Sequence, residues 1–221
     1  MEKFKNKYRI ASHRKPNWDY SADALYFLTI VTQNRECNLG EIVKTDFVHE
    51  KPLTTNIMIP SDFGKIVDYE WFQSFEIRKE LILHDFILMP NHLHTIVEIY
   101  NENRVDITTT TVETHGRVSL SIEPLEINQN EIEFLKIQRN PPIRLPKSIS
   151  SFIAGFKSAV NTKIDDYIDE HHLTIPKYNR NNHFFQPNYH DHIIRNNFEY
   201  QTIQNYIANN PMNWNNDKFY A

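Results

Sequence analysis

The chain has 221 residues, 40% hydrophobic and 13% aromatic, which fits one sizeable folded domain. The N-terminus lacks the apolar segment of a signal peptide, and no apolar run approaches the roughly 20 residues of a membrane span. One cysteine excludes an internal disulfide, and four isolated glycines exclude a glycine-rich phosphate loop. We therefore expect a cytoplasmic protein that spans no membrane.

Charge is unevenly distributed along the chain. The formal net charge is −4 at pH 7, which by itself argues against a nucleic-acid partner. Residues 1–15 nevertheless hold six basic residues and one acidic residue, whereas residues 101–135 hold two basic and seven acidic residues. An acidic segment can hide a basic working face in the net charge. We interpret residues 1–20 as a basic N-terminal arm, for which phosphate binding and a solvated charged tail are alternatives.

Hydrophobic periodicity predicts alternating strands and helices. In chain order these are a strand over 24–33, a hairpin of 41–47 and 52–60, a helix from Ser61, two strands over 81–89 and 92–100, a helix after Ser148, an extended piece over 183–195 and a helix over 197–209. Ser148 and Asn196 are suited to cap the last two helices, and Pro211 ends the final one. Residues 101–142 show no clear periodicity and are predicted to form a long loop or insertion.

This order of elements predicts the fold class. Strands grouped with helices in such a sequence favour an α+β protein, in which helices pack on a mainly antiparallel sheet. The later motifs need the earlier ones, so we expect a single domain over residues 1–221.

Two histidines separated by one residue follow a Pro-Asn corner in the stretch LILHDFILMPNHLHTIVEIY, residues 81–100. Side chains at positions i and i+2 of a strand point to the same face, so His92 and His94 are predicted to lie side by side. Two parallel imidazoles supply half of a metal site. A histidine pair of this kind is more often ordinary structure, so the prediction depends on further ligands elsewhere in the chain.

The final helix carries Tyr206 and Asn210, four residues apart and therefore on one helical face. Ile203 and Ile207 are predicted to face the core instead. Two imidazoles and the Asn210 carbonyl oxygen form a borderline site suited to Mg²⁺ or Mn²⁺ with open positions for phosphate oxygens. A tyrosine with an ordinary pKa near 10 is a poor nucleophile, but a metal-polarised phosphodiester lowers the barrier to its attack.

Four separated segments, in the same order, resemble the REP-associated tyrosine transposases, a group of single-tyrosine transposases with an HUH motif (histidine, hydrophobic residue, histidine). The segments are YFLTIVTQNRE, MPNHLH, SISSFIAGFKSAV and YHDHIIRNNFEYQTIQNYIANNPMNW. The resemblance covers most of residues 20–214. It implies a ferredoxin-like HUH endonuclease fold with a C-terminal tyrosine helix over 197–210.

The resemblance also implies an activity, which is the cleavage and rejoining of single-stranded DNA beside hairpins of repetitive palindromes or transposon ends. His92 and His94 match the metal-binding pair, and Asn210 matches the third ligand. Tyr206 matches the nucleophile that forms a 5′-phosphotyrosine link. Relatives include monomers and homodimers, and both states are left open for this chain.

Several alternatives remain at the level of sequence. Tyr189 is a competing nucleophile. Tyr200 is a weaker candidate, because it lies six residues before Tyr206 on the same helix and so on a different face. His190 and His192 form a second His-x-His, so a four-histidine Zn²⁺ hydrolase is an alternative reading. A domesticated protein that binds DNA hairpins without cleaving them is a third. Further candidates for DNA contact or for support of the site are Arg35, Lys157, His192 and Arg195.

Overall fold

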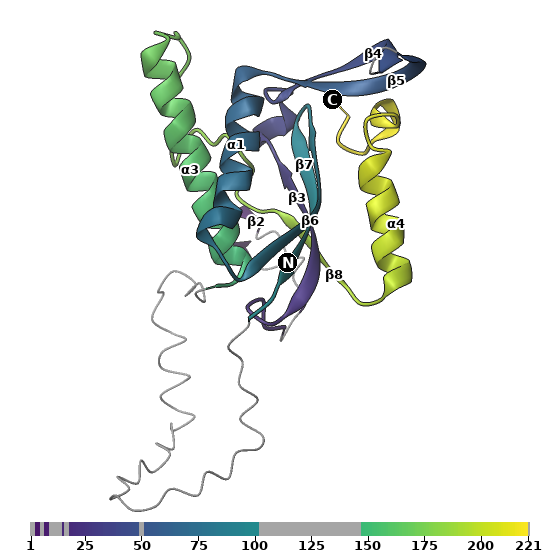
Figure 1. Ribbon diagram of the computed structural model, residues 1–221. Coiled ribbons are helices and arrows are strands. Elements are labelled where there is room, and N and C mark those ends of the chain that lie inside the picture. The colour runs from purple at the N-terminus through teal and green to yellow at the C-terminus, as the bar shows by residue number, and fades with distance from the viewer. Residues whose placement is uncertain are drawn as a thin grey trace, which may run out of the picture.

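The centre of the protein is a four-stranded antiparallel sheet in the order β6-β7-β3-β8 (Figure 1). The computed structural model describes residues 3–4, 7–8, 15, 18–48, 51–101 and 147–220. The strands are β3 (Ala24–Val31), β6 (Leu81–Met89), β7 (His92–Ile99) and β8 (His190–Ile194). Helix α1 (Asp62–Ile77) follows β3 and helix α3 (Ile149–Glu170) precedes β8. Strand, helix, two strands, helix and strand in this sheet order make a ferredoxin-like arrangement, which confirms the predicted α+β fold.

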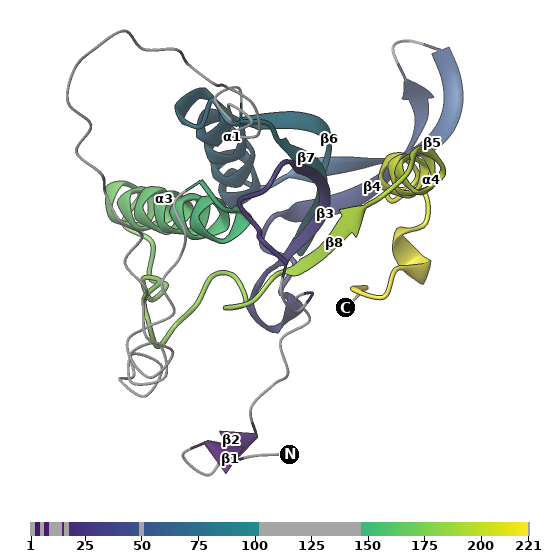
Figure 2. The ribbon, with the colours of Figure 1, turned by 90° about the horizontal axis from the view of Figure 1, so that it is seen from below.

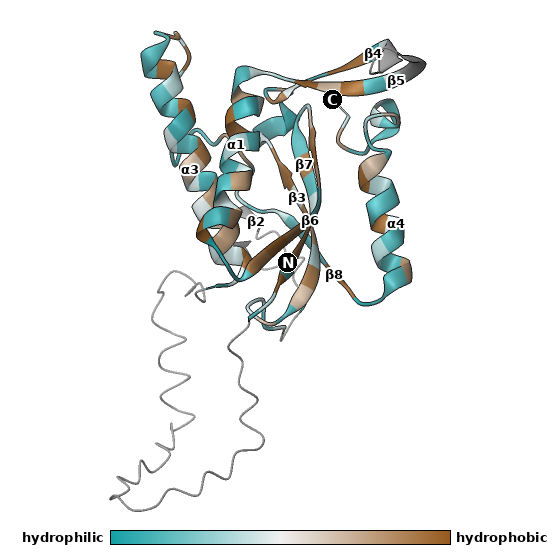
Figure 3. Ribbon diagram, in the orientation of Figure 1, coloured by the Kyte–Doolittle hydropathy of each residue, from teal (hydrophilic) through white to brown (hydrophobic). Residues whose placement is uncertain are grey.

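The helices cover the two faces of the sheet unequally. Helices α1 and α3 pack side by side on one face, and α4 (Asn197–Ala208) lies against the other (Figure 2). The larger core lies under α1 and α3, around the fully buried Trp71. Figure 3 shows the corresponding pattern, with hydrophobic residues along the central strands and alternating colours along the helices. A smaller cluster of Ile96, Ile194 and Ile207 joins α4 to the sheet.

A polar residue caps the N-terminus of each of the helices α1, α3 and α4. The side chains of Ser61, Ser148 and Asn196 each accept a hydrogen bond from the backbone N–H three residues ahead. Each such cap stabilises its helix by about 1 kcal/mol. The Ser148 and Asn196 caps that the sequence predicted are therefore confirmed, and they fix where α3 and α4 start.

A long two-stranded hairpin projects beyond the sheet. Strands β4 (Gly40–Val48) and β5 (Lys51–Pro60) pair antiparallel, as predicted for this stretch. The hairpin reaches over the C-terminal end of α4 (Figure 1), where Asn56 Nδ2 donates to the Pro211 carbonyl at 3.2 Å. This contact ties the hairpin to the segment that follows α4.

Most of the predicted insertion, residues 102–142, and most of the basic arm over residues 1–20 lie outside the described residues. Within that arm, the short strands β1 (Lys3–Phe4) and β2 (Lys7–Tyr8) pair with each other. No helix in the described ranges is long and apolar enough to cross a membrane.

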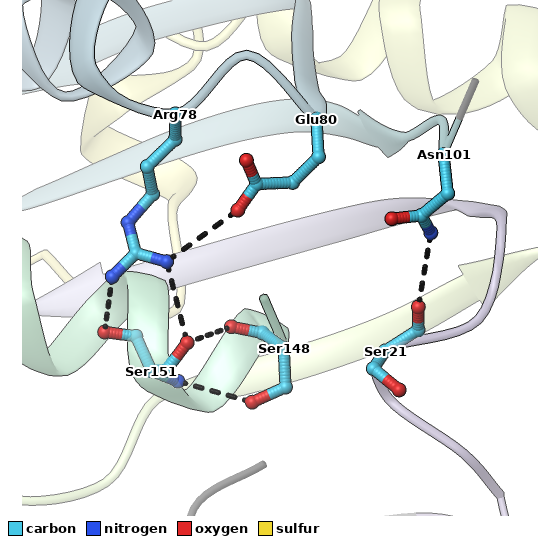
Figure 4. Close-up of polar contacts among 6 residues, drawn as sticks. All are labelled: Ser21, Arg78, Glu80, Asn101, Ser148 and Ser151. Atoms are coloured by element: carbon cyan, nitrogen blue, oxygen red, sulfur yellow. Dashed lines mark hydrogen bonds and ion pairs between the residues drawn. The ribbon is translucent and has the colours of Figure 1, made fainter. Parts of the chain in front are cut away.

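Polar contacts hold the described residues on either side of 102–146 (Figure 4). Asn101 Nδ2 donates to the Ser21 carbonyl at 3.3 Å, and the Ile149 amide donates to the Tyr20 carbonyl at 3.1 Å. Arg78 adds a link from α1 to α3 through Ser151, at 3.3 and 3.1 Å. Asn101 and Ile149 are thus held at the Ile99 end of β7. At 3.3 Å per residue, this end lies about 20 Å from the His92 end of the same strand.

Candidate metal and tyrosine site

His92 and His94 open strand β7 directly after the Pro90–Asn91 turn. Both side chains are fully buried, and their ring centroids are 4.5 Å apart. They face the α4 side of the sheet with Ile96, whereas Leu93 belongs to the larger core on the opposite side. The period of two therefore places the two imidazoles on one face, at the end of the sheet.

A hydrogen bond at Nδ1 of each imidazole orients the ring and leaves its Nε2 available as a ligand. His94 Nδ1 lies 2.8 Å from the Thr29 hydroxyl, and His92 Nδ1 lies 2.8 Å from Asn91 Oδ1. When each Nδ1–H donates to these oxygens, each Nε2 presents a lone pair. His92 Nε2 is buried and has no hydrogen-bond partner among the described residues. A buried acceptor without a hydrogen-bond partner is suited to coordinate a cation.

Burial also keeps both imidazoles neutral. It lowers the pKa of His92 to about 4, against a smaller opposing effect of the Asp217 charge. Burial, with His92 next, lowers the pKa of His94 well below 6.5. Neutral imidazole is the form that binds a metal, so both side chains have the required protonation state at neutral pH.

Helix α4 brings Tyr206 and Asn210 to the histidines. Ile207 packs in the small cluster with Ile96, with Ile203 partly buried beside it, as predicted, and this contact seats the helix on the sheet. Tyr206 Oη then lies 3.1 Å from His94 Nε2. Asn210, just past the helix end, is buried, and its Oδ1 has no hydrogen-bond partner within the described chain. The four residues singled out in the sequence thus meet at one point.

Asp217 belongs to the same cluster, although the sequence analysis did not identify it. Its Oδ2 accepts hydrogen bonds from Tyr206 Oη and Asn210 Nδ2, both at 3.1 Å, and its Oδ1 accepts from the Phe219 amide at 2.6 Å. One ligand atom from each of His92, His94 and Asp217 lies within 4.8 Å of the others. Asp217 directly follows the three-residue 3-10 helix η2 (Trp214–Asn216), which is too short to show a periodicity, so no repeat in the sequence could have indicated it.

Asn91 is a second residue that the sequence analysis missed. Besides orienting His92, its Nδ2 donates to the carbonyls of Arg35 and Phe219, at 2.9 and 2.8 Å. It therefore joins the β6–β7 turn to the C-terminal segment, whose Phe219 ring lies 4.7 Å from the His92 ring. The only sequence signal was its place immediately before the histidine pair.

The donor set fits a divalent cation. Nitrogen atoms of His92 and His94 and a carboxylate oxygen of Asp217 lie within 4.8 Å of one another, and the Asn210 amide, which donates to Asp217, adds an oxygen donor. His92 Nε2 and Asn210 Oδ1 are buried without hydrogen-bond partners in the described residues. Mixed nitrogen and oxygen donors suit Mg²⁺, Mn²⁺ and other first-row divalent cations. The chain can therefore hold a metal at the end of β7.

Tyr206 is protonated in this environment. Burial, followed by the charge of Asp217 and the hydrogen bond to it, raises the Tyr206 pKa to about 12, while Asn210 lowers it slightly. The residue is nevertheless 40% exposed, so a large substrate can reach it. The phenol is thus accessible but needs activation before it can act as a nucleophile.

The competing tyrosines lie elsewhere. Tyr189 packs against the large core under α1 and α3, and its hydroxyl is 3.5 Å from Ser150 Oγ. Tyr200 donates to Asp85 at 3.2 Å, near the opposite end of α4. The Tyr206 hydroxyl, by contrast, lies 3.1 Å from His94 Nε2.

Three further residues that were predicted to contact DNA or to support the site make contacts within the protein. His192 Nε2 lies 2.6 Å from Glu199 Oε1, and the Arg195 amide donates to Glu199 Oε2 at 2.8 Å, which fixes the β8–α4 junction. Lys157 Nζ donates to the Gln186 carbonyl at 2.6 Å. The side chains of His192 and Lys157 thus make contacts within the protein, whereas Arg195 contributes its backbone amide.

Arg35 is the predicted DNA-contact residue that lies nearest the cluster. Its guanidinium donates to the Lys218 carbonyl at 3.0 Å and stands 5.7 Å from the centre of the Phe219 ring. The second His-x-His does not extend the metal cluster, because the grouping of ligand atoms within the described residues includes neither His190 nor His192. The four-histidine arrangement is therefore not formed.

Comparisons with known proteins give a similar curated protein and several similar solved structures, and no family model matches. An uncharacterized protein of Haemophilus influenzae is 26% identical over 223 residues, which cover 97% of this chain and 98% of that protein. A solved structure of a REP-associated tyrosine transposase bound to a REP hairpin is similar over 93% of this chain and 74% of its own length, with 12% identity and a TM-score of 0.49.

Proposed function

We propose that this chain is a metal-dependent endonuclease and strand transferase for single-stranded DNA, which acts beside hairpins through a 5′-phosphotyrosine intermediate. The observation that carries the proposal is the position of Tyr206 Oη, 3.1 Å from both His94 Nε2 and Asp217 Oδ2, two members of the group that could hold a metal. A reactive hydroxyl next to preorganised metal ligands is the arrangement that phosphodiester attack requires. The hairpin substrate is an inference from the sequence motifs.

In the proposed reaction, Tyr206 Oη attacks the scissile phosphorus. The new bond joins the phenol oxygen to phosphorus, the bond to the 3′ oxygen breaks, and the leaving strand ends in a 3′-hydroxyl. Reversal by the 3′-hydroxyl of another strand restores the phosphodiester, so rejoining needs no nucleotide cofactor. This agrees with the absence of a glycine-rich phosphate loop from the sequence.

The chain's own residues have distinct tasks in this scheme. His92, His94 and Asn210 would hold Mg²⁺ or Mn²⁺, and Asp217 is a fourth donor beside them. When bound, the cation supplies Lewis-acid polarisation of the phosphate and favours the ionised phenol. Asp217 Oδ2, 3.1 Å from Tyr206 Oη, is the nearest carboxylate that can take the phenol proton.

Covalent capture tests the proposal. The protein is incubated with labelled single-stranded hairpin oligonucleotides and Mn²⁺, and a denaturing gel is then run. We expect a labelled band at the mass of the protein, which disappears with Tyr206→Phe and with His92→Ala. Tyr189→Phe is the matched control, since its hydroxyl lies against the core on the other face, and this variant should keep the band.

Two results would change the assignment. If Tyr189→Phe removed the band and Tyr206→Phe kept it, the class of reaction would stand and the nucleophile would be wrong. If no variant and no wild-type sample gave a band while hairpins bound tightly in a native gel, the protein would be a hairpin-binding protein without cleavage. The zinc-hydrolase alternative has no geometric support, because His190 and His192 lie outside the ligand cluster.

A further inference from the structure

A small cavity lies next to the candidate nucleophile. It has a volume of about 230 Å³ and is lined by residues from the end of α4 and from the turn that follows it, namely Tyr206, Asn210, Asn213, Asn216, Asp217 and Lys218. This is below the roughly 300 Å³ at which pockets for drug-sized molecules begin. The cavity therefore suits a group of the size of one nucleotide, and anything that occupies it touches Tyr206.

The amides that line the cavity are not equivalent. Asn210 Nδ2 donates to Asp217, and Asn213 Nδ2 donates to the Asn209 carbonyl at 3.0 Å, so both serve the local structure. Asn216 is exposed, and among the described residues it bonds through its backbone amide to the Asn213 carbonyl at 2.9 Å, which leaves its side chain unengaged there. Asn216 instead keeps one donor pair and one acceptor available to the cavity.

A positive charge completes the lining. Lys218 contributes to the cavity wall and stacks its ammonium 4.7 Å from the centre of the Phe219 ring. A compact cation on a flexible stem is suited to a phosphate oxygen. An amide with a free donor and acceptor, a cation and a nucleophilic hydroxyl in one small cavity together match the parts of a single nucleotide.

We infer that this cavity is a subsite for one nucleotide flanking the cut, in which Asn216 reads the edge of the unpaired base and Lys218 contacts its phosphate. The inference rests on the proposed function, because it places that nucleotide beside Tyr206. An asparagine amide pairs in bidentate fashion with adenine, donating to N7 and accepting from N6. The subsite is therefore expected to prefer adenine, and unpaired bases expose the edges that this contact needs.

The test measures binding without metal, so that it does not depend on cleavage. Fluorescein-labelled hexanucleotides of dA, dC or dT are titrated with the full-length protein in EDTA, and fluorescence anisotropy gives each Kd. The wild-type protein should bind the dA strand about 5- to 150-fold more tightly than the other two, the range for one good bidentate pair. Asn216→Ala should bring the three affinities to within about twofold of one another, the level expected without a bidentate contact.

Three further variants separate the roles. Asn216→Asp should shift the preference to dC, because a carboxylate accepts from the cytosine amino group. Lys218→Ala should weaken all three strands alike and reduce the salt slope by about 0.7, the value for one phosphate contact on a single strand. Asn181→Ala, which changes an exposed asparagine in a loop remote from the cavity, should leave every affinity unchanged.

Equal affinities of the wild-type protein for all three strands would overturn the inference, as would a dA preference that survives Asn216→Ala. These outcomes are distinct from failure of the proposed function, which is decided by covalent capture at Tyr206. Loss of the base preference in Asn216→Ala without any covalent product would retain the subsite and remove the nuclease. Asn216 is exposed, so the substitution is not expected to unfold the protein.

Discussion

Thr29 offers a sharp test of whether the histidine pair is a metal site. Its side chain is buried, and its hydroxyl lies 2.8 Å from His94 Nδ1. Thr29→Val removes this partner while the shape changes little. In the tautomer that leaves Nε2 free for a metal, the His94 Nδ1–H is then buried without an acceptor. The ring also loses the contact that directs its Nε2 toward the other ligands.

The structure gives two magnitudes for Thr29→Val. An unsatisfied buried donor costs about 1–3 kcal/mol, and 1 kcal/mol corresponds to about 2–4 °C in Tm for a chain of this size. We therefore expect Tm in EDTA to fall by about 2–12 °C. Loss of a hydrogen bond behind a metal-binding histidine weakens metal affinity about 10- to 100-fold. Thermal unfolding measures the first effect, and calorimetric titration with Mn²⁺ measures the second.

Thr95→Val is the matched control for this experiment. Thr95 is also buried and follows His94 on β7, but it faces away from the site. Its hydroxyl donates to the Asp85 carbonyl at 2.8 Å. It should lower Tm to a similar extent and leave Mn²⁺ affinity unchanged. Thr29→Ser, which keeps the hydroxyl, should bind Mn²⁺ nearly as well as the wild-type protein. If Thr29→Val bound Mn²⁺ as tightly as Thr95→Val, the metal-site reasoning would be refuted.

Three other predictions concern the pH dependence of stability, the pKa of Tyr206 and the contacts that hold α4 on the sheet. Without metal, Tm should fall as pH drops from about 6.5 to about 4, because unfolded His92 takes up its proton near 6.5 and folded His92 only near 4. The same change of Tm with pH in His92→Gln as in the wild-type protein would contradict this. Asp217→Asn should lower the Tyr206 pKa from about 12, because one negative charge beside the phenol is removed; phenolate absorbance, compared with the same variant lacking Tyr206, measures it. Asp85→Ala should speed amide exchange along α4 about 5- to 150-fold, the equivalent of losing about 1–3 kcal/mol, because Asp85 accepts from two side chains of that helix; unchanged exchange would show that the apolar contacts alone hold α4.

Local periodicity was sufficient for much of the fold and for pairs of site residues. A strand repeats every two residues and a helix every 3.6, so His92 with His94, and Tyr206 with Asn210, could each be placed on one face from spacing alone. The caps at Ser148 and Asn196 were equally local, because a cap bonds to a backbone amide only three residues ahead. These features depend on neighbours within one turn or one strand, which the sequence specifies directly.

Only the tertiary structure joined the two pairs and added Asp217. The distance between Tyr206 and His94 is decided by the packing of α4 on the sheet through Ile96 and Ile207, contacts between residues far apart in the chain. Asp217 enters from the end of the short 3-10 helix Trp214–Asn216, and Asn91 holds this C-terminal segment by donating to the Phe219 carbonyl. The sequence by itself determined which side chains share a face. Packing, which depends on shape and burial across the whole domain, decided which faces meet.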